Sequence, residues 1–362
     1  MKIGIYTDLH LCKTTSILPL HSGDSSYSTR LQMCIDTAKW MYELFWNQGV
    51  DIIVNGGDTL DAINVSAEEV SALSEFYAYS RGTREIHIAG NHESYAVNSE
   101  FYTNKILDNL PFVELYTSPC KINDTISVLP YMRAEDVTEE LLSSIKNKFL
   151  ISHIDLKGTH LRDDFVAPDG VDLQSLVSNF DFVANGHMHM AEKLDISHCK
   201  GKRGKQIHNI GAVTSGSFSD NNIYRPSVCI YDSESNTIER FYNPYAILFR
   251  TINSKTLSAF NKSIKALDDN YRYCIRATVP YDLKDAVKEI ISTKENIIAS
   301  RVTLSEIKNN IQVKVNSNTD TDTGVTEEQN TDIAEKFIGY LKTVDSLKYP
   351  IDDYIQVVRE VT

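Results

Sequence analysis

Five apolar segments of this chain each run directly into side chains that can bind metal ions. Each segment has the length of a buried strand and is bounded by Gly, Asn or Asp. Open α/β sheets build their sites beyond the carboxyl ends of their strands, so we expect these side chains to converge. The segments and the donors that follow them are 2–7 with Asp8 and His10, 51–54 with Asp58, 85–89 with Asn91, 148–151 with His153, and 181–184 with His187 and His189.

The seven donors are carboxylate, imidazole and amide groups, and none of them is a thiolate. This mixture favours Mn²⁺, Fe or Zn²⁺ over Ca²⁺, and it differs from a structural zinc site. Seven donors are too many for one tetrahedral ion, whereas two ions that share a carboxylate would use them all. Two such ions activate water for displacement at phosphorus. One Asp-x-His or Gly-His-x-His alone is weak evidence, because strand-end histidines commonly cap turns, so the prediction depends on all five segments together.

Helical patterns between these strands predict the fold class. Residues 28–47 have helical spacing after a capping Ser28 or Thr29, and Ser66 with Glu69 forms a capping box before a second helix. Strands that alternate with helices predict right-handed crossovers and a mainly parallel sheet. Residues 191–242 alternate like a β-meander. We therefore predict a two-sheet α/β sandwich flanked by helices over residues 1–245.

The remaining residues predict a small α/β cap domain, a flexible linker and C-terminal helices. In the cap, 246–315, strands are expected at 247–250, 271–279 and 311–315, with helices at 255–268 and 282–292. Residues 316–330 are polar and rich in Asp and Thr, which is typical of a linker. Residues 331–362 form two amphipathic stripes that either fold back on the cap or dock onto a partner. The partner-binding candidates are Phe337, Leu341, Tyr354, Ile355 and Val358.

The strand-end residues resemble the motifs of a known superfamily. Asp8-x-His10, Gly57-Asp58, Gly90-Asn91-His92-Glu93, His153 and Gly186-His187-x-His189 are similar to the five motifs of the calcineurin-like metallophosphoesterases. Within them the chain looks like the SbcD-type nucleases of phage and bacterial DNA repair and recombination. The narrower resemblance depends on Gly57-Asp58-x-x-Asp61, on Leu129-Pro130-Tyr131-Met132, and on the layout after the catalytic domain.

The resemblance implies a role for each motif residue. One ion would be held by Asp8, His10, Asp58 and His189, and the other by Asp58, Asn91, His153 and His187, with Asp58 as the bridge. His92 would face the scissile phosphate and stabilise the transition state or protonate the leaving oxygen. Many relatives carry His at the position of Asp61, so Asp61 here is expected to orient a ligand or a water. Glu93 stands where relatives usually have Asp, and it too is expected to support the site from behind the metal ligands.

The resemblance also implies the function and the partners. The chain would be the nuclease subunit of an SbcCD-like complex, with exonuclease and endonuclease action on double-stranded DNA and Mn²⁺ as the activating ion. An ABC-class ATPase would be its partner, and the chain would form a homodimer. Two alternatives stay open: another metallophosphoesterase, such as a phosphoprotein phosphatase or cyclic-nucleotide phosphodiesterase, and a non-catalytic scaffold that bridges DNA and the ATPase.

Composition sets limits on location and on DNA binding. The six cysteines are scattered, without a Cys-x-x-Cys pair, which favours free thiols in a reducing cytoplasm, that of the host if a phage encodes the chain. No apolar stretch is long enough to span a bilayer, so we expect no membrane association. The net charge of −13 argues against tight DNA binding by this chain alone.

One basic cluster and several histidines fall outside the motifs. The cluster is either a solvated hairpin tip or a contact to DNA phosphates. His21 lies in a polar loop, 12–27, and we expect it to be a solvent-exposed loop residue. The same expectation holds for His160, His198 and His208, because none of them follows a buried strand and a glycine turn. The basic cluster consists of Lys200, Lys202, Arg203 and Lys205.

Overall fold

The computed structural model describes residues 1–13, 18, 25–94, 102–162, 165–218 and 225–304. These residues belong to one compact unit, Met1–Ile307. The predicted strand at 311–315, the linker 316–330 and the helices within 331–362 lie outside the described residues, and so do His21 and the five partner-binding candidates.

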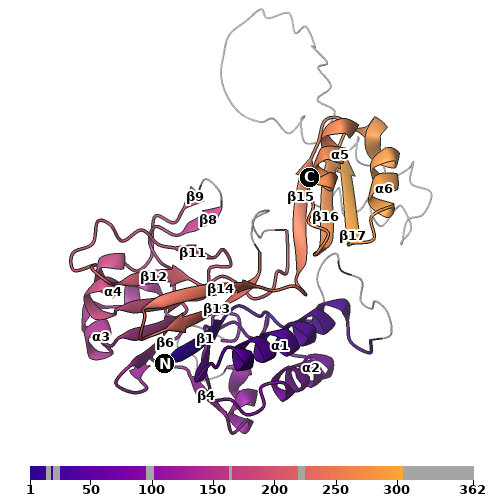
Figure 1. Cartoon of the computed structure of the whole chain (residues 1–362). Helices are drawn as coiled ribbons and strands as arrows, with labels where there is room; N and C mark the ends of the chain where they lie inside the picture. The colour runs from indigo at the N-terminus through magenta and orange to yellow at the C-terminus, as the bar shows by residue number, and fades with distance from the viewer. Residues whose placement is uncertain (14–17, 19–24, 95–101, 163–164, 219–224, 305–362) are drawn as a thin grey trace, which may run out of the picture. The chain divides into compact units, whose positions relative to one another are not determined.

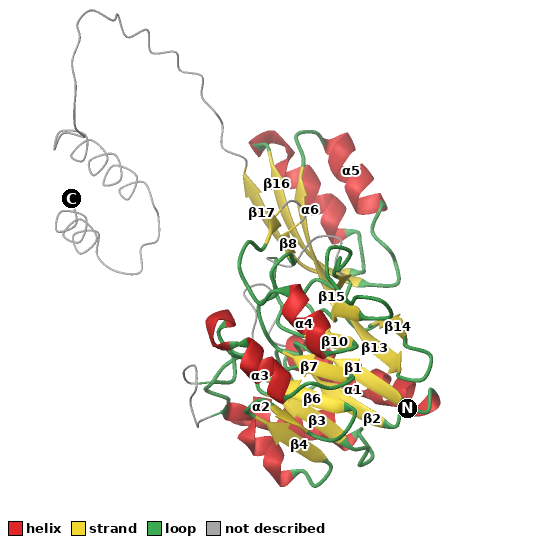
Figure 2. Cartoon of the chain, turned by 90° about the vertical axis from the view of Figure 1, so that its left-hand side faces the viewer, coloured by secondary structure: helices red, strands yellow, loops and turns green. Residues whose placement is uncertain are grey.

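Two six-stranded sheets form the main body (Figures 1 and 2). The first sheet has the order β14-β13-β1-β2-β3-β4, with β1 to β4 parallel. The second has the order β11-β12-β10-β7-β6-β5, with β12, β10, β7 and β6 parallel. The strands of the first sheet are β1 (Lys2–Tyr6), β2 (Ile52–Asn55), β3 (Glu85–Ile88), β4 (Val113–Tyr116), β13 (Ser227–Asp232) and β14 (Thr237–Tyr242). Those of the second are β5 (Cys120–Lys121), β6 (Ile126–Leu129), β7 (Phe149–Ser152), β10 (Phe182–Asn185), β11 (Glu192–Lys193) and β12 (Gln206–Asn209).

The two sheets pack face to face through β-branched and aromatic side chains. Ile3, Ile5 and Val54 of the first sheet share one buried cluster with Ile151 and Phe182 of the second. Helices cover the outer faces: α1 (Thr29–Asn47) and α2 (Ala67–Ala78) on the first sheet, α3 (Glu139–Ser144) and α4 (Leu173–Asn179) on the second. The predicted two-sheet sandwich flanked by helices is therefore confirmed.

The helix starts follow from their capping residues. Ser28 accepts the backbone N–H of Leu31 and caps α1, as predicted. Ser66 and Glu69 form both hydrogen bonds of the predicted capping box at the start of α2. Three short 3₁₀ turns, η1 (Thr103–Asn109), η2 (Ala134–Asp136) and η3 (Tyr281–Leu283), and a small hairpin of β8 (His160–Arg162) and β9 (Phe165–Val166) complete the connections.

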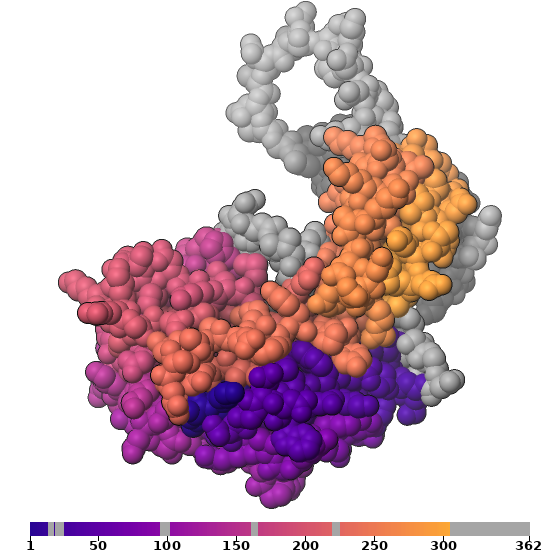
Figure 3. Space-filling view, viewed as in Figure 1, coloured from indigo at the N-terminus to yellow at the C-terminus, as the bar shows by residue number. Residues whose placement is uncertain are grey.

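The predicted β-meander over 191–242 is wrong. Its four strands divide between the two sheets, because β11 and β12 extend the second sheet while β13 and β14 extend the first. β13 runs antiparallel beside β1, with Ile5 opposite Cys229. Alternation in the sequence predicted the strands but not their partners. In Figure 3 the N-terminal residues lie against this later segment.

A third, parallel sheet forms the predicted small α/β unit. It has the order β15-β16-β17, built from β15 (Ile247–Asn253), α5 (Leu257–Lys265), β16 (Arg272–Val279), α6 (Lys284–Ser292) and β17 (Ile297–Leu304). The third strand was expected later, at 311–315, and the strand at Ile297–Leu304, whose side chains are half-buried or exposed, was not predicted. The domain boundary at 245 stays a prediction.

Candidate metal centre

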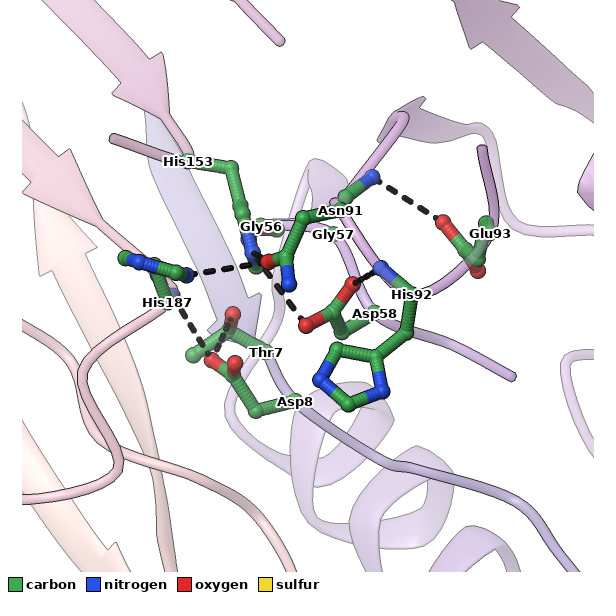
Figure 4. A network of polar contacts seen from close by, with 12 residues as sticks. Thr7, Asp8, Gly56, Gly57, Asp58, Asn91, His92, Glu93, His153 and His187 are labelled. Carbon is green, nitrogen blue, oxygen red and sulfur yellow. Dashed lines mark hydrogen bonds and ion pairs between the residues drawn. The ribbon is translucent and has the colours of Figure 1, made fainter. Parts of the chain in front are cut away.

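The predicted donors lie together at the carboxyl edges of the two sheets. Figure 4 shows Asp8, Asp58, Asn91, His153 and His187 among them. Parallel register places the ends of β1 and β2 level, with Tyr6 opposite Asn55. In the second sheet Ser152 of β7 lies opposite Asn185 of β10. Each donor follows one of these strand ends within a few residues, so the pattern in the sequence becomes one site.

The backbone that carries the donors is strained. Four of them, Asp8, His10, Asp58 and His187, have φ between 45° and 69°, the left-handed region that L-residues with a Cβ rarely adopt. Such a conformation costs about 1–2 kcal/mol per residue and is concentrated at functional sites. Backbone hydrogen bonds hold the turns, since the amides of Asp8 and His10 donate to the carbonyls of Gly57 and Asp58 at 3.0 and 2.9 Å.

Two glycines allow the turns to approach each other. A Cβ at Gly90 would lie 2.0 Å from Asp58 Oδ1, and a Cβ at Gly57 would lie 2.5 Å from His153 Nδ1. Gly57 also has φ of +96°. A side chain at either position would displace a donor, so glycine is required for the packing of the site as well as for its turns.

One cluster of donors consists of Asp8, His10 and His189. The Nε2 atoms of the two imidazoles are 3.0 Å apart, and Asp8 Oδ1 lies 3.8 and 3.9 Å from them. Asp61 Oδ1 lies 2.9 Å from His10 Nδ1, so the other ring nitrogen points into the cluster. Asp8 Oδ1 is buried and has no hydrogen-bond partner among the described residues. A buried carboxylate oxygen without a partner is costly, and a cation would satisfy it.

The second cluster consists of Asp58, His153 and His187, with Asn91 beside them. Asn91 Oδ1 lies 3.0 Å from both His153 Nε2 and His187 Nδ1. His153 Nδ1 donates to the carbonyl of Gly56 at 2.6 Å, which leaves Nε2 free to face Asp58 Oδ2 at 3.3 Å. The same oxygen of Asp58 lies 3.7 Å from His10 Nε2. Asp58 therefore stands between the clusters, where a bridging carboxylate would be needed.

The charges of the site suit a divalent cation. Burial favours a neutral imidazole in His10, yet Asp61 and Asp8 outweigh it and raise its pKa to about 10. Burial acts in the same way on His153, but Asp58 raises its pKa to about 9. The carboxylates thus hold protons on the imidazoles, and a metal ion would bind in competition with those protons. Oxygen and imidazole donors around two centres fit two divalent ions, although they do not identify the metal.

A carboxylate that the sequence reasoning missed lies behind His187. Asp155 Oδ1 is 3.1 Å from His187 Nε2, so the hydrogen on that nitrogen points to Asp155 and Nδ1 faces the donor cluster. Metal-binding histidines are commonly oriented by such a carboxylate. The available signal was its place two residues after His153, the spacing that also separates Asp8 from His10 and His187 from His189.

Asp61 and Glu93, the other predicted supporting carboxylates, lie in different environments. Asp61 is partly exposed and contacts His10 at the rim. Glu93 is fully buried beneath the turn, where it accepts the amides of Leu60 and Gly90 at 3.0 Å. Burial and then the charge of Asp58 raise the pKa of Glu93 to about 7. Glu93 therefore anchors the turn of Asn91.

His92 lies over the donors and its side chain is 42% exposed. Its Nδ1 is 3.0 Å from the carbonyl oxygen of Asp61, which requires the hydrogen to be on Nδ1. Its ring centre is 4.7 Å from that of His10, while its backbone amide donates to Asp58 Oδ1 at 3.0 Å. His92 is thus fixed by its backbone and open to a substrate. Figure 4 shows it beside Asp58.

The structure does not bring the predicted basic cluster to this site. β12 is parallel to β10, so the loop before β12 lies at the opposite, amino edge of the second sheet. Two of the side chains bond locally, since Lys202 Nζ donates to the carbonyl of Ser197, and Lys205 Nζ to that of Val177. His208, expected in a solvated loop, is 6% exposed and stacks on Phe182 within the sandwich, so that expectation is wrong.

Comparisons with known proteins point to one family. The family model for calcineurin-like phosphoesterases matches residues 1–191. No curated protein matches the chain. No helix among the described residues has the length and apolar character to cross a membrane.

Similar solved structures share part of the arrangement at low identity. Protein TT1561 of Thermus thermophilus has a TM-score of 0.41 at 9% identity over 67% of this chain and 98% of its own. A dimetal phosphatase from Danio rerio has a TM-score of 0.37 at 14% identity over 64% and 91%. The purple acid phosphatase PPD1 of yellow lupin has a TM-score of 0.40 at 12% identity over 67% and 51%, so this chain spans about half of it.

Proposed function

The chain belongs to the calcineurin-like phosphoesterase family, and on this premise we propose that it is a two-metal phosphodiesterase that cuts double-stranded DNA. The observation that supports the chemistry most directly is the pair of donor clusters on either side of Asp58. Divalent ions bound there would supply Lewis-acid stabilisation of a phosphate and activation of a water. We take Mn²⁺ as the activating ion, because mixed imidazole, amide and carboxylate donors suit it better than Mg²⁺.

The protein's own side chains supply the remaining chemistry. His92 is held by two contacts and exposed on one face, so in its protonated form, with Nδ1 donating to Asp61, its Nε2–H can donate to a phosphate oxygen or protonate the leaving oxygen. Asp61 and Asp155 keep the imidazoles of His10 and His187 in the required orientation.

DNA as the substrate rests on the narrower resemblance to SbcD-type nucleases. Tyr131, from the Leu129-Pro130-Tyr131-Met132 segment of that resemblance, lies at the site, with its ring 5.8 Å from that of His187 and 6.3 Å from that of His153. We further propose an SbcCD-like complex in which an ABC-class ATPase and a second copy of the chain are partners. The charge of −13 supports a complex in which other subunits contribute most of the DNA affinity.

The test compares three substrates under Mn²⁺. Hairpin duplex DNA, bis-p-nitrophenyl phosphate and p-nitrophenyl phosphate represent a nuclease, a simple diester and a monoester. We expect cleavage of the first two, little activity with Mg²⁺ alone, and stimulation of DNA cleavage by the ATPase with ATP. Hydrolysis of only the monoester would favour a phosphatase, and no hydrolysis would favour a scaffold.

Two variants separate the proposed roles. His92→Ala is expected to bind both ions and lose cleavage, because His92 contacts phosphate and not metal in the proposal. Asp58→Ala is expected to lose metal and to melt at a lower temperature in the presence of Mn²⁺, since an ion that binds the native state stabilises it. Metal analysis that found His92→Ala without ions would contradict the role given to His92.

A further inference from the structure

Arg30, in the first turn of α1, has a guanidinium group buried beneath the metal centre. The residue is 1% exposed and makes four hydrogen bonds to oxygen. Its Nη1 donates to the carbonyl of Ser215 at 2.7 Å. Its Nη2 lies within 3.1 Å of the carbonyls of Leu9 and His10 and of the hydroxyl of Thr214. All four of these oxygens are uncharged.

Helix packing does not explain a cation at this position. A buried charge is costly unless it is hydrogen-bonded, and an apolar side chain of similar size would pack α1 at least as well. Arg30 is the largest side chain among the fully buried residues of the described part of the chain. The geometry of its donors, two nitrogens that reach three backbone carbonyls and a hydroxyl, shows what the charge is used for: it joins segments of main chain.

Those segments carry the donors of one cluster. The carbonyls of Leu9 and His10 flank the left-handed turn at His10. Thr214, which accepts from Arg30, also donates its hydroxyl to the carbonyl of Leu9 at 2.7 Å. The stretch before Thr214 continues the network, because the amide of Val213 donates to Thr7 O at 2.9 Å and that of Ala212 donates to His189 O at 3.1 Å.

The second cluster is held by other contacts. None of the four oxygens bonded by Arg30 belongs to the segments that carry Asp58, His153 and His187. Those donors follow β2, β7 and β10, and His153 is oriented by the carbonyl of Gly56. Arg30 therefore bonds one half of the centre directly, and it reaches the other half only through the hydrogen bonds from Asp8 and His10 to the turn at Asp58.

We propose that Arg30 is a positioning residue for one ion of the pair: it fixes the turn at His10 and the 212–215 segment so that Asp8, His10 and His189 present their donors to that ion. This inference rests on the two-metal site of the proposed function. It assigns Arg30 no contact with substrate.

The experiment measures Mn²⁺ stoichiometry on the full-length chain by calorimetry and native mass spectrometry. The wild type is expected to bind two ions. Arg30→Met is expected to bind one ion at a concentration that saturates the wild type, with the Kd of the other raised roughly 10–100-fold, the usual effect of losing a group that orients metal ligands. Spin coupling between two Mn²⁺ ions, seen by electron paramagnetic resonance, should be lost with it. Arg30→Lys keeps the positive charge but loses the planar guanidinium with its several N–H donors. Its affinity for the second Mn²⁺ should lie between those of the wild type and Arg30→Met.

Arg240→Met is the matched control. Arg240 also uses Nη1 to join main chain and side chain, donating to Ile210 O and Ser227 Oγ at 2.6 Å, but neither acceptor flanks a donor. The Arg240→Met protein should be less stable than the wild type and should still bind two ions. An Arg30→Met protein that keeps both ions at wild-type affinity, or loses both equally, would overturn the proposal.

Three further outcomes are also decisive. If Arg30→Met does not fold, Arg30→Lys and Thr214→Val decide by the same stoichiometry, because Thr214→Val removes only the hydroxyl between the guanidinium and Leu9. Wild-type protein that binds a single ion would reject the two-metal function and Arg30's role with it. Two ions without hydrolysis of DNA would reject only the DNA substrate, and the Arg30 result would stand.

Discussion

The two edges of the second sheet differ in how they use charged side chains. At the carboxyl edge, His153 and His187 are tied to other groups of the site, and His187 has a φ of 69°. At the amino edge the loop before β12 turns on Gly201 and Gly204, and its lysines are exposed or bond nearby carbonyls. Strain and burial are concentrated where chemistry is expected, whereas the more conspicuous charge cluster is satisfied locally. Donors that follow strands therefore predicted a site better than a run of basic residues did.

Adding one methyl group beside the donors and one in the loop before β12 tests this contrast with the largest expected effect. Gly90→Ala places a Cβ 2.0 Å from Asp58 Oδ1, so the carboxylate must move. Since a displacement of about 1 Å can cost roughly 100-fold in rate, we expect Mn²⁺-dependent hydrolysis of bis-p-nitrophenyl phosphate to fall at least that far. Gly204→Ala is the control, because φ is +75° there and nothing lies within 4 Å. It should lose some stability and keep its activity. Equal activities of the two variants would contradict the contrast.

Removing the carboxylate behind His187 should have the next largest effect. Asp155→Asn keeps the shape but weakens the hydrogen bond to His187 Nε2. The affinity for Mn²⁺ should fall roughly 10–100-fold. Asp195→Asn, at an exposed turn where the carboxylate bonds Ser197, should leave the affinity unchanged. Calorimetric titration of both variants checks the result, and an unchanged Kd for Asp155→Asn would exclude an orienting role.

Acid should destabilise the second sheet through His208. Burial lowers the pKa of His208 to about 4, so the native state keeps the imidazole neutral while the unfolded chain takes up a proton below about pH 6.5. The contribution to stability is complete above that pH and is lost as the pH falls from about 6.5 to 4, by at most about 3 kcal/mol. In urea unfolding of metal-free protein, His208→Gln should lose less stability than the wild type between pH 7 and 4.5. If His208→Gln and the wild type lose the same stability over this pH range, His208 does not titrate as described.

Neutralising the amino-edge loop should have the smallest effect. With Lys200, Lys202, Arg203 and Lys205 changed to Gln, hydrolysis of bis-p-nitrophenyl phosphate should change less than about twofold, because the loop lies at the other end of the strands. The Kd for duplex DNA at low salt should also change less than about twofold. A clear loss of DNA affinity with a shallower salt dependence would instead show that the loop contacts phosphates.

Local signals in the sequence were enough for most of the fold and for the grouping of donors. Apolar runs that end in Asp, Asn or His predicted the strands, and Ser28 and Ser66 predicted the helix starts. Strand partners were not predictable in the same way, because alternation over 191–242 does not specify which sheet each strand joins. Arg30 carries no local motif, since its role depends on oxygens that only the folded chain brings near it. Asp155 had one local signal, its place two residues after His153, but the imidazole that it orients follows a different strand. His208 was expected in a loop because it does not follow a buried strand and a glycine turn, and that criterion does not detect a histidine within a strand.

The pairing of β1 with β13 has a consequence for the order of folding. Ile5 lies opposite Cys229, so β1 cannot complete its pairing until β13, one of the last strands of the sandwich, has been made. Contacts so distant in the chain slow folding, because a long loop must close before they form. Asp8 and His10 follow that first strand directly, and their partner His189 is made much later. During synthesis Asp8 and His10 therefore lack His189 until most of the second sheet has been made, and complete metal uptake should be a late event.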